Sequence, residues 1–260
     1  SNWSSCPPLS SYHHLTNPMI AFPALLSKIL VGAVAILGTA RYSFGLYGWR
    51  IAEKLEKPVY TVIQKLPGGV ELRQYEPYMI AETTVDGVGF REPTSSGFRA
   101  CAGYIFGKNK PRRGMADGEK MAMTAPVRVS GQTSPVGEKM AMTAPVRVNG
   151  GRNKKTRVSF VIGSKYTRKS VPKPMDRNVS IRQVPRHVLA TKTFAGPPPS
   201  DDRVATERQK IEYALETVGL KPTDDETLVY GYHDPFITPN FLRRNEVAVY
   251  IDEKSVAALQ

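Results

Sequence analysis

The sequence contains few cysteines and histidines: of its 260 residues, two are Cys and four are His. The two cysteines, Cys6 and Cys101, lie far apart in the chain, which excludes a dense disulfide framework. Common signatures of catalysis are also missing, since the sequence has no Gly-x-Ser-x-Gly elbow, His-Glu-x-x-His zinc motif, phosphate-binding loop or Cys-x-x-Cys pair. We therefore expect a binding or structural protein rather than an enzyme.

Acidic residues are scarce relative to basic ones, 23 against 36, and the net charge is +13. The imbalance is local, because the segment from Lys108 to Arg182 holds 18 Lys and Arg but four Asp and Glu. Such a segment favours anionic partners such as lipid headgroups, an acidic protein or nucleic acid, although a set of solvated loops would also explain it. Interleaved aromatic residues and a known reader motif are missing, which argues against nucleic acid.

A long uninterrupted hydrophobic run is absent as well. The longest candidate, Ile29 to Ala40, has 12 residues, which is short of the roughly 20 that a spanning helix needs. However, Lys28 and Arg41 border this run, and long basic side chains can reach the membrane surface. Nearby aromatic residues resemble an interfacial belt: Tyr42, Tyr47 and Trp49. We predict a helix at about 19–49 that anchors the chain to a membrane; a signal or transit remnant and a helix packed on the domain are the alternatives.

From residue 58 the sequence pattern changes to strands. Apolar runs and turn signals predict strands at 59–65, 70–75, 78–85, 157–163, 179–184 and 187–194, and two more around a loop near residue 235. Apolar residues at helical spacing predict one helix capped by Ser95 or Ser96 and another capped by Asp201 or Asp202. The order of strands, helix and strands occurs twice, which indicates an α+β duplication with antiparallel strands.

A segment of twelve residues, Gly118–Val129, recurs unchanged as Gly137–Val148. Two copies are too few for a solenoid, so a tandem duplication is the simplest explanation. Only one copy can fill a given strand of the fold. We expect the region 118–148 to add a β-hairpin, with residues 130–135 as its turn.

Each copy of the repeat carries two methionines at alternating positions, Met121 and Met123 or Met140 and Met142. In a strand, each pair would point to one face. Methionine suits flat ligands because it is soft and adaptable, and it fills irregular cores equally well.

Three ordered blocks of the sequence resemble motifs of the SOUL/heme-binding protein family: an opening hairpin of Val59–Val62 with Val70–Tyr75, the central Glu119–Val127, and the closing Gly231–Phe236 followed by Arg243–Glu246. The resemblance covers residues 58–252. It leaves 1–57 as an N-terminal tail with the anchor helix and 253–260 as a short tail. The second copy of the central block departs from the family pattern, so the copy that fills the family strand stays open.

The resemblance implies a distorted antiparallel β-barrel with two helices, built from an internal duplication. It also implies an exchangeable heme or related tetrapyrrole in an apolar groove between the first helix and the closing loop. Mapped onto this sequence, the groove residues are Phe98, Ala102, Ile105, Phe106, Met121, Met140, His233, Phe236 and Ile237. Core packing is the alternative role for each of them.

Cationic and metal-binding roles follow from the same mapping. Arg99, Lys108 or the basic segment would meet the propionates of the ligand. His233 is the candidate axial ligand of the iron, and Tyr104 is a weaker one.

The leading hypothesis is therefore a membrane-associated tetrapyrrole carrier, buffer or sensor. The alternative is a structural or accessory subunit of a membrane protein complex with little or no heme binding. Plant and algal relatives in plastids, together with an uncharged N-terminal tail, favour a chloroplast thylakoid membrane first and a mitochondrial membrane second.

Overall fold

The computed structural model describes residues 18–86, 92–110, 119–132, 155–234 and 237–258. It divides into two compact units, residues 1–44 and residues 45–260. Helix α1 (Pro18–Glu53) begins in the first unit and ends in the second.

Helix α1 is longer than the predicted 19–49 segment, and its described apolar side chains are mostly exposed, as for Leu30, Ile36 and Leu37. The 28 residues Leu26–Glu53 are long and apolar enough to cross a membrane, since they would span roughly 42 Å as a helix. A signal segment near the N-terminus has the same properties. The apolar helix itself is therefore confirmed, and its relation to a membrane stays a prediction.

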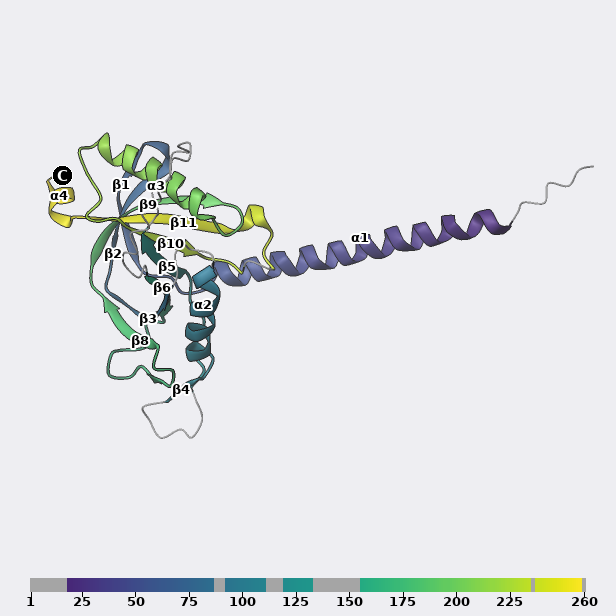
Figure 1. The fold of residues 1–260 in the computed structure, drawn as a ribbon, viewed down its shortest axis with the longest axis horizontal. Coiled ribbons are helices and arrows are strands. Elements are labelled where there is room, and N and C mark those ends of the chain that lie inside the picture. The colour runs from purple at the N-terminus through teal and green to yellow at the C-terminus, as the bar shows by residue number, and fades with distance from the viewer. Residues whose placement is uncertain (1–17, 87–91, 111–118, 133–154, 235–236, 259–260) are drawn as a thin grey trace, which may run out of the picture. The chain divides into compact units, whose positions relative to one another are not determined.

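The second unit is built on a curled antiparallel sheet (Figure 1). Within the described residues, its nine strands have the order β1-β2-β9-β11-β10-β5-β6-β3-β8. Their bounds are β1 Tyr60–Leu66, β2 Val70–Tyr75, β3 Tyr78–Asp86, β5 Val127–Gln132, β6 Lys155–Ile162, β8 Val179–Val184, β9 His187–Ala195, β10 Glu226–Gly231 and β11 Arg244–Ile251. A separate pair joins β4 (Asn109–Lys110) to β7 (Lys173–Pro174). The predicted α+β class with a distorted antiparallel barrel is confirmed, and the sheet forms a half-barrel.

Two helices cover this sheet. Helix α2 (Glu92–Ile105) packs on β3 and β6, and helix α3 (Asp201–Glu216) packs on β9 and β11 (Figure 1). Short helical turns are η1 (Pro67–Gly69), η2 (Asn240–Leu242) and α4 (Glu253–Ala257), the last within the expected C-terminal tail.

The predicted helix starts were wrong by a few residues. Helix α2 begins at Glu92, before Ser95. Helix α3 is capped by Ser200, whose side-chain oxygen accepts a hydrogen bond from the Arg203 N–H. Asp201 and Asp202 occupy the first turn instead. Their negative charges stabilise the helix there, because its N-terminal end carries a partial positive charge.

Alternating residues of β10 and β11 build two separate cores. Val229, Val247 and Val249 belong to the cluster that also contains the apolar residues of α3. Leu228, Tyr230 and Ala248 point to the other face and join a cluster rich in tyrosine. The tyrosine-rich face of the sheet contains the pocket described below.

The central motif does not form the predicted strand. Residues 119–123 have no strand structure, and β5 begins at Val127 and continues to Gln132, where the turn was expected. Met121 is 4% exposed and Met123 39%, so the pair does not share one face. The Met121 N–H donates a hydrogen bond to the Ile105 carbonyl (2.8 Å). This bond attaches the segment to the end of α2 rather than to a strand. The second copy, with Met140, lies outside the described residues.

Candidate functional site

The predicted groove residues on α2 and in the central motif lie mainly in the core. Ile105 and Met121 are buried in one apolar cluster. Ala102 is buried in another, against which Phe98 packs with its ring centroid 5.1 Å from that of Phe160. Phe106 differs, because it is 55% exposed. Among these residues, Phe106 is the one most accessible to a large ligand.

The closing loop packs against the end of α1. The Nε2 atom of His233 lies 3.1 Å from Oε1 of Glu53, and its Nδ1 atom accepts a hydrogen bond from the Arg244 N–H at 3.0 Å. Burial lowers the pKa of His233, and the nearby Glu53 offsets part of this effect. Both ring nitrogens are therefore engaged, so iron ligation would require breaking one of these contacts. Ile237 is partly exposed beside Gly48, and Phe236 lies outside the described residues.

The alternative ligand Tyr104 is also engaged. Its side chain is buried, and its hydroxyl group donates a hydrogen bond to the Pro172 carbonyl at 2.9 Å. The phenol oxygen is thus directed into the domain rather than toward a surface ligand.

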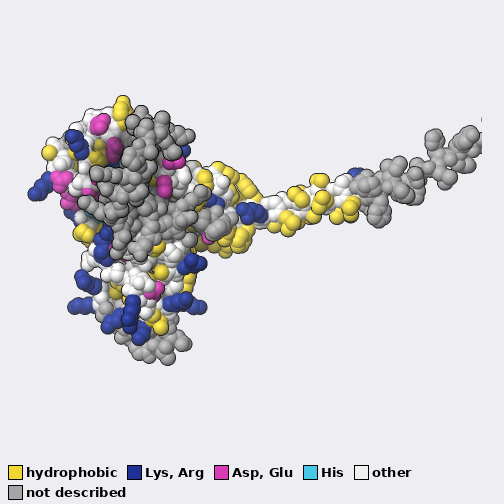
Figure 2. Space-filling view, viewed as in Figure 1, with side chains coloured by type: hydrophobic (Ala, Val, Ile, Leu, Met, Phe, Trp, Pro, Cys, Tyr) yellow, Lys and Arg dark blue, Asp and Glu magenta, His cyan; other side chains and the backbone are white. Residues whose placement is uncertain are grey.

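Exposed apolar and basic side chains gather where α2 ends; we call this region the α2-end surface. Its members are Phe106, Met123, Met175, Lys108, Lys110 and Lys173, all of which are exposed. The Met175 N–H donates a hydrogen bond to the Lys108 carbonyl (3.3 Å). Lys110 on β4 lies opposite Lys173 on β7 in the register of the two strands. Figure 2 shows Lys and Arg side chains concentrated at this end of the domain, where Figure 1 places β4.

Asn109 holds the α2-end surface together. Its side-chain amide is buried and donates to the carbonyls of Tyr104 (2.8 Å) and Glu119 (2.7 Å). Its side-chain oxygen accepts a hydrogen bond from the Glu119 N–H at 2.9 Å. These bonds connect the last turn of α2 to the central motif. Phe106 directly follows that turn and Met123 lies in that motif, so Asn109 links the two segments that carry them.

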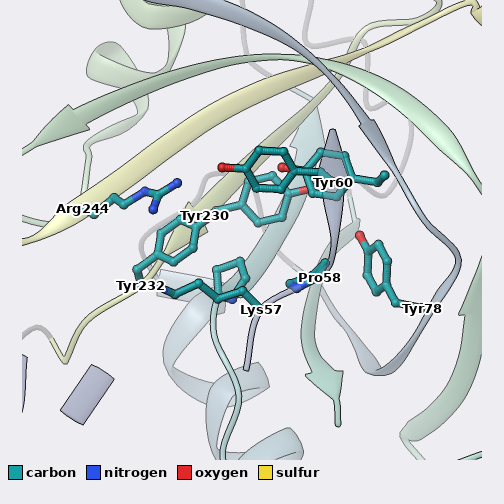
Figure 3. A pocket seen from close by; sticks show the side chains of 9 residues that line it. Lys57, Pro58, Tyr60, Tyr78, Tyr230, Tyr232 and Arg244 are labelled. Atoms are coloured by element: carbon teal, nitrogen blue, oxygen red, sulfur yellow. The ribbon is translucent and has the colours of Figure 1, made fainter. Parts of the chain in front are cut away.

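A separate pocket lies on the tyrosine-rich face of the sheet (Figure 3). Its enclosed volume is about 30 Å³, and the whole hollow, including the part open to solvent, is about 350 Å³. Five tyrosines and two cations dominate its lining, which consists of Lys57, Pro58, Tyr60, Tyr75, Tyr78, Pro126, Tyr230, Tyr232 and Arg244. Sequence reasoning missed this tyrosine pocket. The alternation of Tyr230 and Tyr232 was a signal, but the other tyrosines come from strands that only the fold brings together.

A buried carboxylate organises one wall of the tyrosine pocket. Glu246 is completely buried and accepts hydrogen bonds from Arg73 (3.0 Å), Arg244 (2.6 Å) and the Tyr232 hydroxyl (2.7 Å). Burial alone would raise the pKa of Glu246, but the two guanidinium groups and the phenol outweigh it and hold the pKa below its usual value. The carboxylate is therefore ionised at neutral pH, and its charge is fully paired.

Comparison with known proteins gives one strong match. The model of the SOUL heme-binding protein family matches residues 55–250 of the chain. No curated protein matches the chain.

Similarity to solved structures is remote. A hydrolase from Listeria innocua has 9% identity, covers 70% of this chain and 91% of its own, and gives a TM-score of 0.48. The C-terminal domain of EcmrR has 9% identity, with 75% of this chain and 98% of that domain covered, and gives a TM-score of 0.44. The structure of SAV2435 bound to tetraphenylphosphonium has 9% identity, with 71% of this chain and 94% of that chain covered, and gives a TM-score of 0.37. These similarities are too remote to indicate a shared activity.

Proposed function

The chain belongs to the SOUL heme-binding protein family, and on that premise we propose that it binds heme or a related tetrapyrrole as an exchangeable ligand. The observation that carries this proposal is the family match over residues 55–250, which includes all three sequence motifs. We expect a carrier, buffer or sensor rather than an enzyme.

The chemistry of the α2-end surface supports this proposal. A tetrapyrrole is a broad apolar disc with carboxylates at its rim, so it needs an apolar contact area and nearby cations. Phe106, Met123 and Met175 supply exposed apolar area, and Lys108, Lys110 and Lys173 supply cations. Exposed apolar groups of this kind often mark a binding site. We propose that the disc lies against Phe106, the most exposed of the expected groove residues on α2 and in the central motif.

The tyrosine pocket is a poorer candidate for the whole macrocycle. Its enclosed volume is about 30 Å³, far below the roughly 300–1,000 Å³ typical of small-molecule pockets. A tetrapyrrole would therefore have to remain largely outside it.

A hemin titration of the full-length chain in mild detergent tests the proposal. We expect a saturable shift of the Soret band with a dissociation constant on the order of micromolar. Phe106→Asp should weaken binding about tenfold, because it places a negative charge in the apolar area and beside the propionates. Tyr213→Asp is the matched control, since Tyr213 is an aromatic residue on α3 that is 70% exposed. The absence of a saturable shift would reject tetrapyrrole binding.

We further propose that α1 attaches the protein to an organelle membrane, with the thylakoid as first choice and a mitochondrial membrane as second. Support comes from the length of Leu26–Glu53 and from its exposed apolar side chains. A full-length Val34→Asp/Leu37→Asp variant should move from the membrane fraction to the soluble fraction, because charges are costly inside a bilayer. Tyr213→Asp should stay membrane-bound. Retention of the double variant would contradict the anchor.

The same preparations address the accessory-subunit alternative. Purification of the chain with one large membrane complex, combined with the absence of a hemin response, would favour that role. A hemin response from the isolated chain would favour the carrier.

A further inference from the structure

Residues 164–177, between β6 and β8, form a strongly positive segment that we call the basic loop. It contains five cations and one carboxylate: Lys165, Arg168, Lys169, Lys173, Arg177 and Asp176. All six residues are exposed. Within the residues that the structure describes, none of the five cations forms an ion pair. Their charges are therefore available to a partner outside the chain.

Buried residues fix the basic loop to the domain. Tyr166 and Val171 belong to an apolar cluster that they share with the end of α2. The Tyr166 hydroxyl donates a hydrogen bond to Glu119 (2.8 Å), and the Tyr104 hydroxyl donates one to the Pro172 carbonyl (2.9 Å). The exposed cations of the loop therefore start from a fixed backbone, which reduces the entropy that binding a partner would cost.

A tight turn in the basic loop presents two of its cations together. The N–H groups of Ser170 and Val171 donate hydrogen bonds to the Thr167 carbonyl at 3.0 and 2.9 Å. The Thr167 N–H donates a further hydrogen bond to the Ser170 hydroxyl at 2.9 Å. Arg168 and Lys169 are the two central residues of this turn, and both are exposed. Their side chains therefore leave from adjacent points of one well-defined turn.

The basic loop adjoins the cations of the α2-end surface. Strand β7 lies within the loop and pairs with β4, which places Lys173 opposite Lys110. The Met175 N–H donates a hydrogen bond to the Lys108 carbonyl, so the backbone of Lys108 also lies beside the loop. Figure 2 shows Lys and Arg side chains gathered at this end of the domain. The loop and the α2-end surface therefore form one positively charged region.

Nearby carboxylates do not neutralise the basic loop. Glu119 accepts the hydrogen bond from the Tyr166 hydroxyl, and Glu56 accepts one from the Ser164 N–H at 2.6 Å. Asp176 accepts one from the backbone N–H of the residue directly after the loop at 2.9 Å. These three carboxylates help to fix the loop, but the cations of the loop and of the α2-end surface outnumber them.

The part of the domain around α3 has the opposite charge. Residues 201–226, which include α3, hold eight Asp and Glu against four Lys and Arg. Helix α3 packs on β9 and β11, whereas the basic loop adjoins β4 and the end of α2. Figure 1 places α3 and β4 at opposite ends of the domain. This charge asymmetry would turn the basic loop toward a negatively charged surface.

The composition of this positively charged region favours a lipid bilayer over other anionic partners. Lysine is its most frequent cation, and lysine is depleted in protein–protein interfaces, where arginine is enriched. Single-stranded nucleic acid would need several aromatic side chains for base stacking, whereas Tyr166 of the loop is buried and Phe106 is the one aromatic member of the α2-end surface. Lysines next to exposed apolar side chains such as Met175 suit lipid phosphates above an apolar layer.

We propose that the basic loop docks the domain onto the anionic surface of a lipid bilayer. The exposed cations of the loop bind lipid phosphates, and each Lys or Arg close to such a surface strengthens association by about fivefold. The adjoining α2-end surface is thereby held close to the bilayer. Docking requires neither a bound tetrapyrrole nor the insertion of α1.

Hydrogen exchange of the full-length chain, measured without tetrapyrrole, tests the docking. The probes are phosphatidylcholine vesicles with about 30 mol% phosphatidylglycerol or with none. We expect backbone exchange in residues 164–177 to be at least about threefold slower on the anionic vesicles alone, and about 0.5 M NaCl should remove the effect by screening. Unchanged exchange on anionic vesicles, equal slowing on neutral vesicles, or slowing that persists in salt would each overturn the proposal. Insertion of α1 would affect both kinds of vesicle alike.

Two double variants with the same change in net charge locate the docking surface. Arg168→Glu/Lys169→Glu alters two exposed residues of the loop, so the protein should fold, and the slower exchange on anionic vesicles should disappear. Lys65→Glu/Lys221→Glu reverses two exposed lysines, on β1 and after α3, and should retain the effect. Loss of the effect in both variants, or in neither, would overturn the assignment to the basic loop.

Other anionic partners are tested in the same assay. Slower exchange of residues 164–177 with double-stranded DNA or poly-glutamate, but not with anionic vesicles, would overturn the choice of a bilayer. Slower exchange with the vesicles alone would support it. Because no tetrapyrrole is present, a negative hemin titration would leave these results unchanged, and the failure of either proposal can be recognised separately.

Discussion

At the scale of single residues, the contact between α2 and the sheet depends on Gly97. A Cβ atom added at this position would lie 2.6 Å from Cγ2 and 2.7 Å from Cβ of Val158. Gly97→Ala should therefore destabilise the domain by about 1–3 kcal/mol, the usual cost of overpacking. At Gly103, an added Cβ would meet the flexible Lys108 side chain at 3.2 Å, so Gly103→Ala should be neutral or stabilising by up to about 1 kcal/mol. Urea unfolding measures both changes; equal midpoints would contradict the prediction.

The charge of the buried Glu246 should contribute strongly to folding. Its carboxylate offsets Arg73 and Arg244, both of which would lose their buried partner in Glu246→Gln. We expect a loss of about 3–5 kcal/mol in the free energy of unfolding. Glu71→Gln is the control, because Glu71 pairs with Arg73 at a partly exposed position and should cost less than about 1 kcal/mol. Similar losses in the two variants would show that burial of the pair is unimportant.

At the scale of secondary-structure elements, the strands that carry a clear pattern were predictable. The predicted bounds of β2 and β8 match the observed ones, because turn residues border apolar positions in both. The two-residue strands β4 and β7 are too short to have a periodic signal. Met121 and Met123 were assigned to one face because their spacing fits a strand, whereas tertiary contacts with α2 determine the local structure.

The end of α1 and the closing loop form one packed element pair. A Cβ at Gly45 would lie 2.8 Å from the Ile237 carbonyl oxygen and 2.9 Å from Cδ of Pro239. Gly45→Ala should therefore push the helix end away from the loop and cost about 1–3 kcal/mol. Hydrogen exchange in residues 237–242 should become faster. Gly38→Ala is the matched control, since nothing in the described structure lies within 4 Å of the added atom; faster exchange in both variants, or in neither, would argue against this contact.

At the scale of the whole molecule, the sequence motifs predicted a distorted antiparallel barrel, and the apolar stretch at 19–49 predicted a helix. The structure bears out both, with the sheet as a half-barrel. The tyrosine pocket could not be predicted in the same way. Tyr60, Tyr78 and Tyr230 lie on separate strands, and each alone resembles an ordinary core residue. Likewise, Arg128 follows a proline-containing motif that looked like strand sequence, and its burial opposite Tyr230 results from the pairing of β5 with β10. Local pattern therefore predicts the scaffold, whereas the pocket depends on the pairing of distant strands.

The pH dependence of stability is a property of the whole molecule that two histidines should dominate. Burial lowers the pKa of both His187 and His233 from 6.5. Below about pH 6.5 the unfolded chain binds protons that the folded chain does not, so stability is full above this pH and falls as the solution is acidified. The loss per histidine is at most about 1.4 kcal/mol per pH unit.

Acidification from pH 7 to pH 5 tests the histidines separately from Glu246. The pKa of Glu246 is held below 4.5, so its contribution is lost at lower pH than that of the histidines. Urea unfolding should show a falling free energy from pH 7 to pH 5 in the parent chain, a smaller slope in His187→Gln, and a still smaller slope when His233→Gln is added. A free energy of unfolding that stays constant or rises on acidification would contradict the burial of a neutral His187 beside Arg128. A charged imidazole at that position would be buried near another cation, and burial and Arg128 both lower the pKa of His187.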